Sequence, residues 1–272
     1  MKLKVLLYCL LGGLPLTISA MGVGGFGWWW LSGIVLAAAF VPVALFGPRK
    51  LLAQLGVIVL PLLIITVLCT ATEAWIFAPS YREHAVRNFV GAAFMYLIAA
   101  AVLALLASVL KLSRESERPV PHRSIGTTAV MVVVAGFSYL LYYLIFGAIT
   151  YQFFTKGYYP EATQQVAQLG LWFWAIQIGR GALMTLAVLP MIYTLRMCRW
   201  QAAVAVGAVI WIAGGLSPLL VPNDMMGTTQ RMIHVVEILT QNASLGITAA
   251  LLLRPKQTAG SRETASAATA IS

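Results

Sequence analysis

Charged residues are scarce in this chain of 272 residues. They make up 10% of the sequence, whereas hydrophobic residues make up 60%. A soluble domain usually carries about 25% charged residues and about 45–50% apolar ones. So few charges cannot cover a water-facing surface of this size, and the excess apolar side chains need lipid as their solvent. The composition therefore excludes an ordinary soluble domain and predicts an integral membrane protein.

Cysteine and histidine are also rare, with three of each in the chain. Cys9, Cys69 and Cys198 fall in separate apolar segments without CxxC or Cys/His spacing, which predicts small buried hydrophobes rather than disulfides or a zinc site. The sequence contains no HExxH motif, no P-loop and no pair of intramembrane aspartates. His234 has no second membrane-embedded histidine with which to ligate haem. We therefore expect no cofactor and no metal.

The basic residues outnumber the acidic ones, which gives a formal charge of +10. They occur in short clusters between apolar runs and form no basic face interleaved with aromatics. This pattern indicates orientation in a bilayer and attraction to anionic headgroups, and it predicts no nucleic-acid partner.

A membrane-spanning helix needs about 20 mostly apolar residues. Eight such segments occur, near residues 5–22, 28–47, 51–71, 89–110, 126–149, 169–194, 200–221 and 233–253. Thirteen of the eighteen Lys and Arg residues fall at one end of these spans, four at the other, and Arg180 lies inside a span. The positive-inside rule then places both termini in the cytoplasm. The predicted fold is all-α, a polytopic bundle in a plasma membrane or bacterial inner membrane, with the lipid bilayer as its main partner.

The first segment has an alternative interpretation. Residues 1–20 begin with two lysines, continue with an apolar stretch and end at Ile18-Ser19-Ala20, which also suits a cleaved signal peptide. Cleavage would leave seven spans and an external N-terminus.

The polar segment 113–125 divides the chain into two sets of four spans. We expect a first half over residues 1–112, a cytoplasmic linker over 113–125, a second half over 126–254 and a disordered cytoplasmic tail over 255–272. Trp28–Trp30 with Pro42 in one half, and Trp172–Trp174 with Pro190 in the other, suggest a parallel repeat. The Trp-to-Pro spacings differ, however, and an interfacial aromatic belt explains the tryptophans equally well.

Arg180 is the residue that most needs an explanation. It follows Trp174 by six residues, which puts it roughly 9 Å below the interface at 1.5 Å per residue. A charge there costs at least ~2.5–3.5 kcal/mol, so it needs a partner or water. Gln177 lies one turn away on the same face, and the flanking Gly179 and Gly181 permit close approach of a helix or ligand.

The eighth segment offers partners for this arginine. Its polar residues recur at helical spacing and form one stripe, namely Arg231, His234, Glu237, Gln241 and Ser244. We expect an ion pair between Arg180 and Glu237, with His234 beside it as a group that exchanges protons. Tyr142 from the fifth segment and Glu73 from the end of the third are candidate further walls of the site.

The predicted ligand-binding set is therefore Arg180, Gln177, His234, Glu237, Gln241, Tyr142 and Glu73. One interpretation is an outer-half polar pocket in which Arg180 binds an anion. The other is an internal Arg–Glu clamp that fixes two helices. A Ser217–His234 dyad resembles the arrangement of rhomboid-type proteases, but Pro218 replaces the glycine that follows their serine.

Three functions remain open at this point. A transporter or permease for a small polar or anionic solute fits the intramembrane arginine and the polar stripe best. A membrane-embedded enzyme could act on a lipid or lipid-linked substrate at the outer face, using His234 and Glu237 for proton transfer. A non-catalytic subunit or sensor would consume its polar groups in internal pairs. Enzymatic activity is the less favoured expectation, and the oligomeric state is open.

Overall fold

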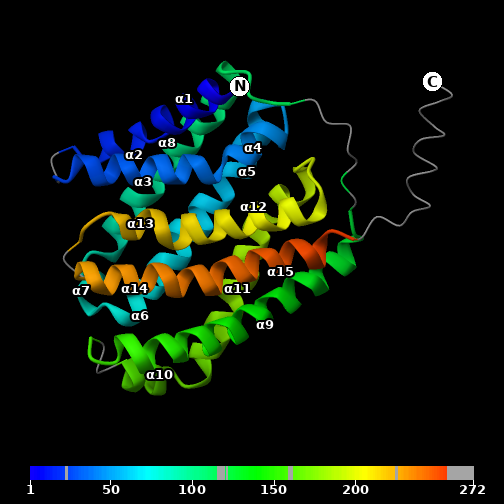
Figure 1. Cartoon of the computed structure of the whole chain (residues 1–272). Coiled ribbons are helices and arrows are strands. Elements are labelled where there is room, and N and C mark those ends of the chain that lie inside the picture. Colours follow the sequence, from blue (N-terminus) through cyan, green and yellow to red (C-terminus); the bar gives the residue numbers. More distant parts are fainter. Residues whose placement is uncertain (22–23, 115–119, 121, 159–161, 224–225, 256–272) are drawn as a thin grey trace.

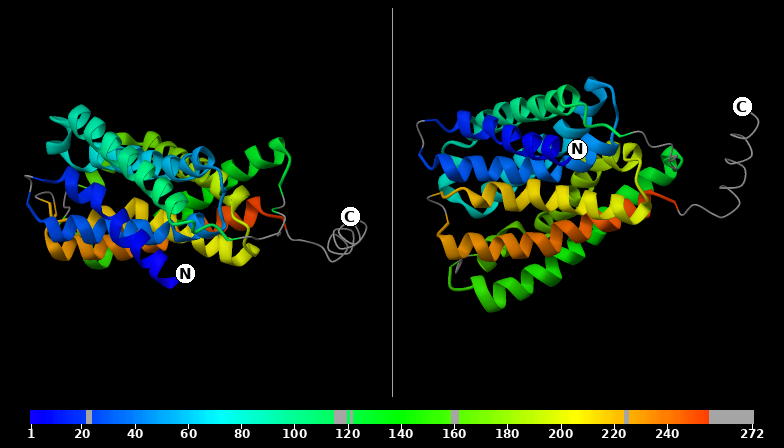
Figure 2. Two further views of the ribbon diagram at one scale, coloured as in Figure 1. Left: turned by 90° about the horizontal axis from the view of Figure 1, so that it is seen from above. Right: turned by 45° about the horizontal axis from the view of Figure 1, so that its top comes forward.

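The protein is a bundle of eight long antiparallel helices, seen in a computed structural model that describes residues 1–255 except 22–23, 115–119, 121, 159–161 and 224–225. The start of the chain and the end of the eighth helix lie toward the same end of the bundle (Figure 1). Two further views show the helices running side by side (Figure 2). We call the end with the termini the inner end and the opposite end the outer end.

Each span is assembled from one to three helical elements. The spans are span 1, α1 (Lys2–Gly12) with α2 (Leu14–Ser19); span 2, α3 (Phe26–Ala39) with α4 (Val41–Phe46); span 3, α5 (Leu51–Pro61), η1 (Leu62–Cys69) and α6 (Thr70–Phe77); span 4, α8 (Ala85–Val109); span 5, α9 (Ile125–Thr150) with η2 (Tyr151–Thr155); span 6, α11 (Leu171–Thr194); span 7, α12 (Arg199–Trp211), η3 (Ile212–Leu216) and α13 (Ser217–Leu220); and span 8, α14 (Thr228–Ile238), η4 (Leu239–Ala243) and α15 (Ser244–Leu253). Two short helices, α7 (Pro79–Arg82) and α10 (Ala162–Leu169), lie in the outer connections.

The eight predicted spans are confirmed, and every named element of the described residues is a helix. The main differences concern length. Span 3 continues to Phe77 rather than ending near residue 71, and span 5 continues to Thr155. Span 3 is extended by α6, which follows the π-helical η1, and span 5 is extended by the π-helical η2 after Thr150. Because span 3 is longer, Glu73 lies inside a helix instead of at the start of a loop.

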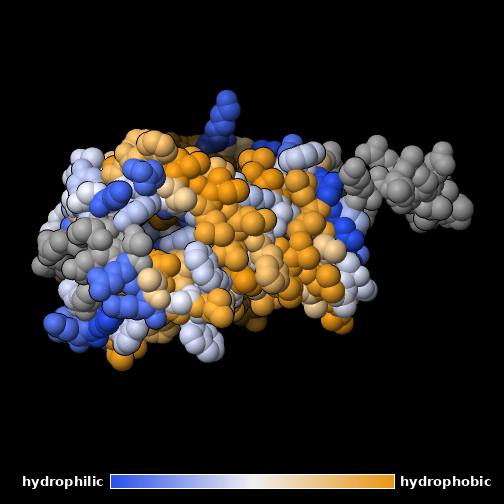
Figure 3. Space-filling view, turned by 90° about the horizontal axis from the view of Figure 1, so that it is seen from below, coloured by the Kyte–Doolittle hydropathy of each residue, from blue (hydrophilic) through white to orange (hydrophobic). Residues whose placement is uncertain are grey.

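The surface has the polarity that a bilayer requires. In one space-filling view hydrophobic residues form a broad central band, and hydrophilic residues gather toward the two ends (Figure 3). Large apolar side chains are exposed on the long helices, for example Val133, Leu141 and Val204. With eight apolar helices of membrane-spanning length, the chain is a multi-pass integral membrane protein.

Glycines allow three pairs of helices to approach closely. A Cβ on Gly181 would lie 2.5 Å from Tyr139 Cβ and 3.1 Å from Gly136 Cα, where α11 crosses α9. A Cβ on Gly246 would lie 2.6 Å from Gly207 Cα, where α15 crosses α12. Gly33 meets Gly13 in the same way between spans 1 and 2. Packing of small residues is the usual way to associate helices in lipid, where no hydrophobic force drives them together.

The packing pairs of the first four spans recur among the last four. Span 1 packs on spans 2 and 4, and span 2 and span 4 each pack on span 3, while the same holds for spans 5, 6, 7 and 8 in that order. Spans 2 and 4 also touch, as do spans 6 and 8. Between the two sets, span 3 packs on span 6, span 2 on span 7, and η1 on η3. Exchanging each span with the one four places later leaves this pattern unchanged.

Arginines close the helix ends at the inner side. Arg254 donates from Nη2 to the carbonyl oxygens of Leu195 (3.0 Å) and Met197 (3.1 Å), just after α11. Arg199 donates to the carbonyls of Leu251 and Arg254 at the end of α15. The last carbonyls of a helix have no partner within it, and their partial negative charge favours a cation. These basic residues therefore hold the fold together as well as orienting it.

Candidate functional site

The buried Arg180 of span 6 pairs with Glu73 of span 3. Arg180 Nη2 lies 2.8 Å from Glu73 Oε2, and Nη1 donates to Gln177 Oε1 at 2.8 Å. The guanidinium also lies 5.9 Å from the ring centroid of Tyr139 on α9, within reach of a cation–π interaction. Cys69, the last residue of η1, lies close to it as well. The pair thus joins spans 3 and 6, which belong to different sets of four.

This cluster leaves buried donors without partners. Gln177 is fully buried and Arg180 is 7% exposed, yet Gln177 Nε2 and Arg180 Nε have no hydrogen-bond partner within the described chain. A buried donor without a partner is costly. The Glu73 side chain, in contrast, is 37% exposed, so its carboxylate reaches toward the open side of the cluster. Arg180 and Gln177 therefore have unbonded N–H groups that a ligand's acceptor atoms could satisfy. The partly exposed carboxylate of Glu73 pairs with the same guanidinium.

A second polar group lies on span 8. His234 Nδ1 is 2.9 Å from Glu237 Oε2, and Gln241 Nε2 donates to Glu237 Oε1 at 3.1 Å. Both oxygens of the carboxylate are therefore engaged by its own helix. Gln241 belongs to the π-helical η4, and Glu237 and Gln241 lie against Gly147 of α9, where the absence of a side chain gives them room. An imidazole bonded to a carboxylate is suited to holding or releasing a proton.

The two groups act on one another electrostatically. The charges of Glu73, Arg180 and Glu237 all act on Tyr139, which is buried, and on Tyr143 of α9, which is partly buried, and Glu73 acts on His234. Six of the seven predicted site residues therefore lie in one polar region in the outer half of the bundle, around α9. We call it the outer polar cluster: Glu73, Gln177, Arg180, His234, Glu237 and Gln241.

The predicted ion pair between Arg180 and Glu237 is wrong. Arg180 pairs with Glu73, and Glu237 pairs with His234. Spans 6 and 8 do pack together, but through α15 in the inner half, whereas α14 packs on α9, α13 and η3. The helical stripe placed Glu237 on one face of span 8 but could not indicate which helix would be its neighbour.

Two further polar residues lie apart from this cluster. Tyr142 hydroxyl lies 2.7 Å from Thr248 Oγ1 of α15, so this bond joins spans 5 and 8. Arg231, the first member of the predicted stripe, is buried and donates to Thr228 Oγ1 at 3.3 Å. Its Nε and Nη1 have no partner within the described chain.

Ser217 is engaged by span 2. Its Oγ lies 2.9 Å from Ser32 Oγ, and Ser32 Oγ donates to the Ser217 carbonyl at 2.7 Å. Both serines are fully buried. The sequence offered no reason to single out Ser32, except that it is a lone hydroxyl two residues after the three tryptophans. This bond joins spans 2 and 7, the contact that corresponds to the Arg180–Glu73 contact between spans 6 and 3.

Below the outer polar cluster the buried face of span 6 is apolar. Met184, Val188 and Met191 of α11 are all at most 1% exposed, and the only buried polar neighbour on this face of α11, Thr185, donates to the carbonyl of Gly181. The inner half is therefore closed along span 6.

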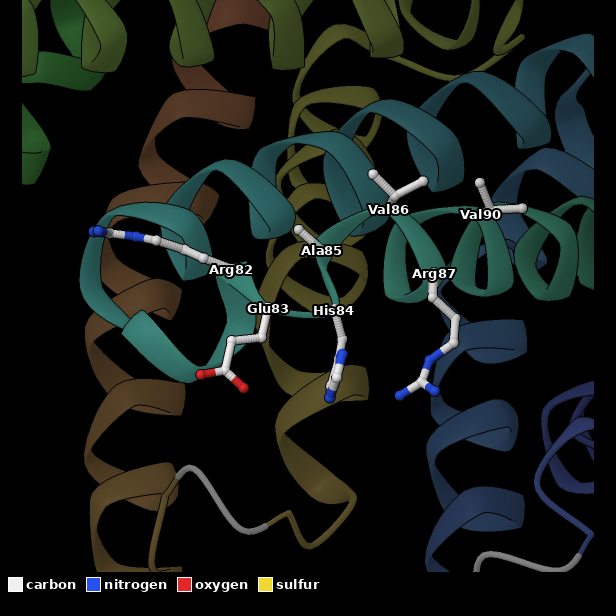
Figure 4. A pocket seen from close by; sticks show the side chains of 7 residues that line it. All are labelled: Arg82, Glu83, His84, Ala85, Val86, Arg87 and Val90. Carbon is white, nitrogen blue, oxygen red and sulfur yellow. The ribbon is translucent and has the colours of Figure 1, made fainter.

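Two cavities lie at opposite ends of the bundle, and none of the predicted site residues is among their described lining residues. The larger, about 550 Å³, lies at the outer connection between spans 3 and 4 and is lined by Arg82, Glu83, His84, Ala85, Val86, Arg87 and Val90. Glu83, His84 and Arg87 point to one side there, whereas Arg82 points away from them (Figure 4) and donates to the carbonyls of Trp75 and Ile76 at the end of α6. The smaller cavity lies at the inner end.

The cysteines differ in exposure. Cys69 is buried as expected, Cys9 is partly buried, and Cys198 is exposed at the inner end, contrary to expectation. Within the described ranges no three His, Cys, Asp or Glu side chains come together as metal ligands would. The predicted linker and tail lie partly outside the described residues, at 115–119, 121 and 256–272.

No protein-family model, curated protein or solved structure matches this chain.

Proposed function

We propose that the protein is a membrane transporter for a small anionic or polar solute, and that Arg180 binds the solute's anionic group. The observation that carries this proposal is the buried guanidinium and its neighbour Gln177, which together present two unpartnered N–H groups beside a partly exposed carboxylate. A carboxylate or phosphate ligand can accept from Arg180 in bidentate fashion. It would take the place of Glu73, whose side chain is 37% exposed.

The packing pattern supports movement between two sets of spans. Arg180–Glu73 and Ser32–Ser217 are both polar links in the contacts between the first four and the last four spans. Many transporters consist of two such repeats, with the solute at the interface between them, and the repeats move against each other. A solute that displaces Glu73 from Arg180 breaks one of these links, and thereby couples binding to the movement. The apolar inner half of span 6 is consistent with a state closed to the inside.

The test is uptake by the purified protein in liposomes, with acetate, succinate, phosphate and sulfate as solutes. We expect saturable uptake of at least one anion. Arg180→Ala should abolish it, and Arg180→Lys should keep part of it because the charge remains but the bidentate geometry is lost. Glu73→Gln should lower the half-saturating concentration, since the internal competitor of the solute is gone.

The control is Arg87→Ala, which removes an exposed arginine from the same side of the bundle and outside the outer polar cluster. Uptake by a well-expressed Arg180→Ala variant at the wild-type rate would contradict the proposal. So would a wild-type protein that transports none of the four anions.

The His234–Glu237 pair favours an enzyme at the outer face as the second candidate function. This acid–base pair suits proton transfer to a lipid-linked substrate. The expected nucleophile Ser217 bonds to Ser32, however, so this alternative has no assigned attacking group. If His234→Ala abolished turnover of a lipid-linked substrate and left anion uptake unchanged, the result would favour the enzyme.

A further inference from the structure

A cavity of about 350 Å³ lies at the inner end of the bundle, between the start of span 3 and the end of span 4. Its lining residues are Ala44, Arg49, Gln54, Ala107, Ser108, Lys111 and Ser113. Among these described residues two are cations, three have neutral hydrogen-bonding side chains, and none is acidic. The volume is at the small end of the range for small-molecule sites, about 300–1,000 Å³.

Gln54 contributes a polar side chain to the wall of this cavity. It lies in the second turn of α5 and is 4% exposed, so it is a buried polar residue. Its side-chain amide makes no hydrogen bond within the described part of the chain, so its N–H groups are available to a ligand. The amide lines the cavity, and an acceptor bound there would satisfy its N–H groups.

Lys111 occupies a position that normally belongs to glycine. Its φ is 49°, the left-handed conformation that follows the end of α8. The helix ends in a Schellman motif, in which Leu112 N–H bonds the carbonyl of Ala107 and Lys111 N–H bonds that of Ser108. Glycine would adopt this conformation without strain. A lysine here places an ammonium group on the cavity at the cost of backbone strain.

The corresponding cations of the second set of spans bind the chain's own backbone. Arg199 and Arg254 donate to carbonyl oxygens at the ends of α15 and α11. The Lys111 ammonium group has no such partner among the described residues. The two helices that line the cavity also carry exposed leucines, with Leu52 of α5 at 80% and Leu105 of α8 at 52% exposure. Cation, amide and adjoining apolar surface together suit a molecule with an anionic head and an apolar body.

We infer that this cavity binds the phosphate group of an anionic phospholipid from the inner leaflet, with Lys111 and Gln54 as its main donors. Lys111 and Arg49 supply charge, and the Gln54 amide and the hydroxyls of Ser108 and Ser113 supply neutral donors to the phosphate oxygens. The acyl chains would lie against the lipid-facing leucines. The site is independent of the outer polar cluster and does not require that the protein be a transporter.

The experiment measures retention of lipid by the full-length protein. Native mass spectrometry after reconstitution into nanodiscs of phosphatidylcholine and phosphatidylglycerol counts the phosphatidylglycerol that stays bound. Lys111→Gly relieves the backbone strain while it removes the charge, so its fold is not at risk. We expect it to lower retention about fivefold, the effect of one basic residue near an anionic surface. Gln54→Leu, close in size to glutamine, should lower retention similarly.

The matched control is Lys50→Ala. It removes an exposed lysine that lies next to Arg49 at the start of α5 but is not part of the cavity lining. It should retain phosphatidylglycerol as the wild type does, and all four proteins should retain phosphatidylcholine equally. Unchanged phosphatidylglycerol retention in Lys111→Gly and Gln54→Leu would overturn the site. If millimolar inorganic phosphate displaces the lipid and stabilises the wild-type protein by itself, the ligand is a free phosphate and the lipid assignment is wrong.

Discussion

Arg180 shows how one residue can both stabilise the bundle and serve the proposed function. A guanidinium at this depth costs at least ~2.5–3.5 kcal/mol without a partner, and Glu73 offsets that cost at 2.8 Å. Glu73 is the one of the two that can move, because its side chain is 37% exposed and that of Arg180 is 8% exposed. Arg180 is therefore fixed in the core, whereas Glu73 is the partner that a solute anion can replace.

Glu73→Gln should destabilise the protein because it leaves the buried guanidinium uncompensated. Removing one partner of a buried pair costs about 3–5 kcal/mol, and the low end applies here because water screens the exposed part of the carboxylate. Thermal unfolding of the purified protein in detergent measures the loss. The double variant Glu73→Gln/Arg180→Gln should recover most of it, since no charge is then left buried. A single Glu73→Gln variant as stable as the wild type would show that Arg180 does not depend on this partner.

At the scale of the helix, the two glycines that flank Arg180 have different environments. A Cβ on Gly181 would meet Tyr139 Cβ at 2.5 Å and Gly136 Cα at 3.1 Å, whereas a Cβ on Gly179 would have nothing within 4 Å. Gly181 therefore sets the distance between α11 and α9, and with it the position of Arg180 over the Tyr139 ring.

Gly181→Ala should separate these helices and cost about 1–3 kcal/mol, as overpacking usually does. The atoms it meets are a Cβ and a Cα, which cannot rotate away. Gly179→Ala is the matched control, and it should be neutral or gain up to ~1 kcal/mol because alanine is the better helix former. Unfolding midpoints of the two variants in the same detergent give the comparison. Equal midpoints would mean that α9 and α11 tolerate a wider separation than the contact implies.

The positions of the spans could be predicted because lipid imposes its demands on each segment separately. Any segment that crosses must be apolar and about 20 residues long, and its basic flanks orient it. The partner of Arg180 could not be predicted in this way, because it depends on which helices become neighbours. The sequence offered both Glu73 and Glu237 as site residues, and the choice between them followed from the packing of α6 and α14. The π-helical conformation of η1 was equally unpredictable, since the sequence of Leu62–Cys69 is that of an ordinary apolar helix.

At the scale of the whole molecule, the orientation in the membrane follows from charge, and Cys198 can report it. Cys198 is exposed at the inner end, whereas Cys69 is buried. A membrane-impermeant maleimide should leave Cys198 unlabelled in intact cells and label it once the membrane is permeabilised. Lys156→Cys in a Cys198→Ser background should behave oppositely, because residue 156 is exposed at the outer end. Labelling of Cys198 in intact cells would reverse the orientation and with it the outer location of the polar cluster.

The contacts between the two sets of four spans should hold them together without the chain that joins them. Span 3 packs on span 6 and span 2 on span 7, and these contacts include the Arg180–Glu73 pair and the Ser32–Ser217 bonds. None of them involves the connection between spans 4 and 5. A protease site inserted after Arg118 should therefore allow cleavage into two fragments that co-purify in detergent and unfold together. Adding Glu73→Gln and Ser32→Ala to the cleavable protein should make the fragments separate more readily, because each removes one of the polar links. Fragments that part on cleavage alone would mean that the covalent connection, rather than these contacts, holds the two sets of spans together.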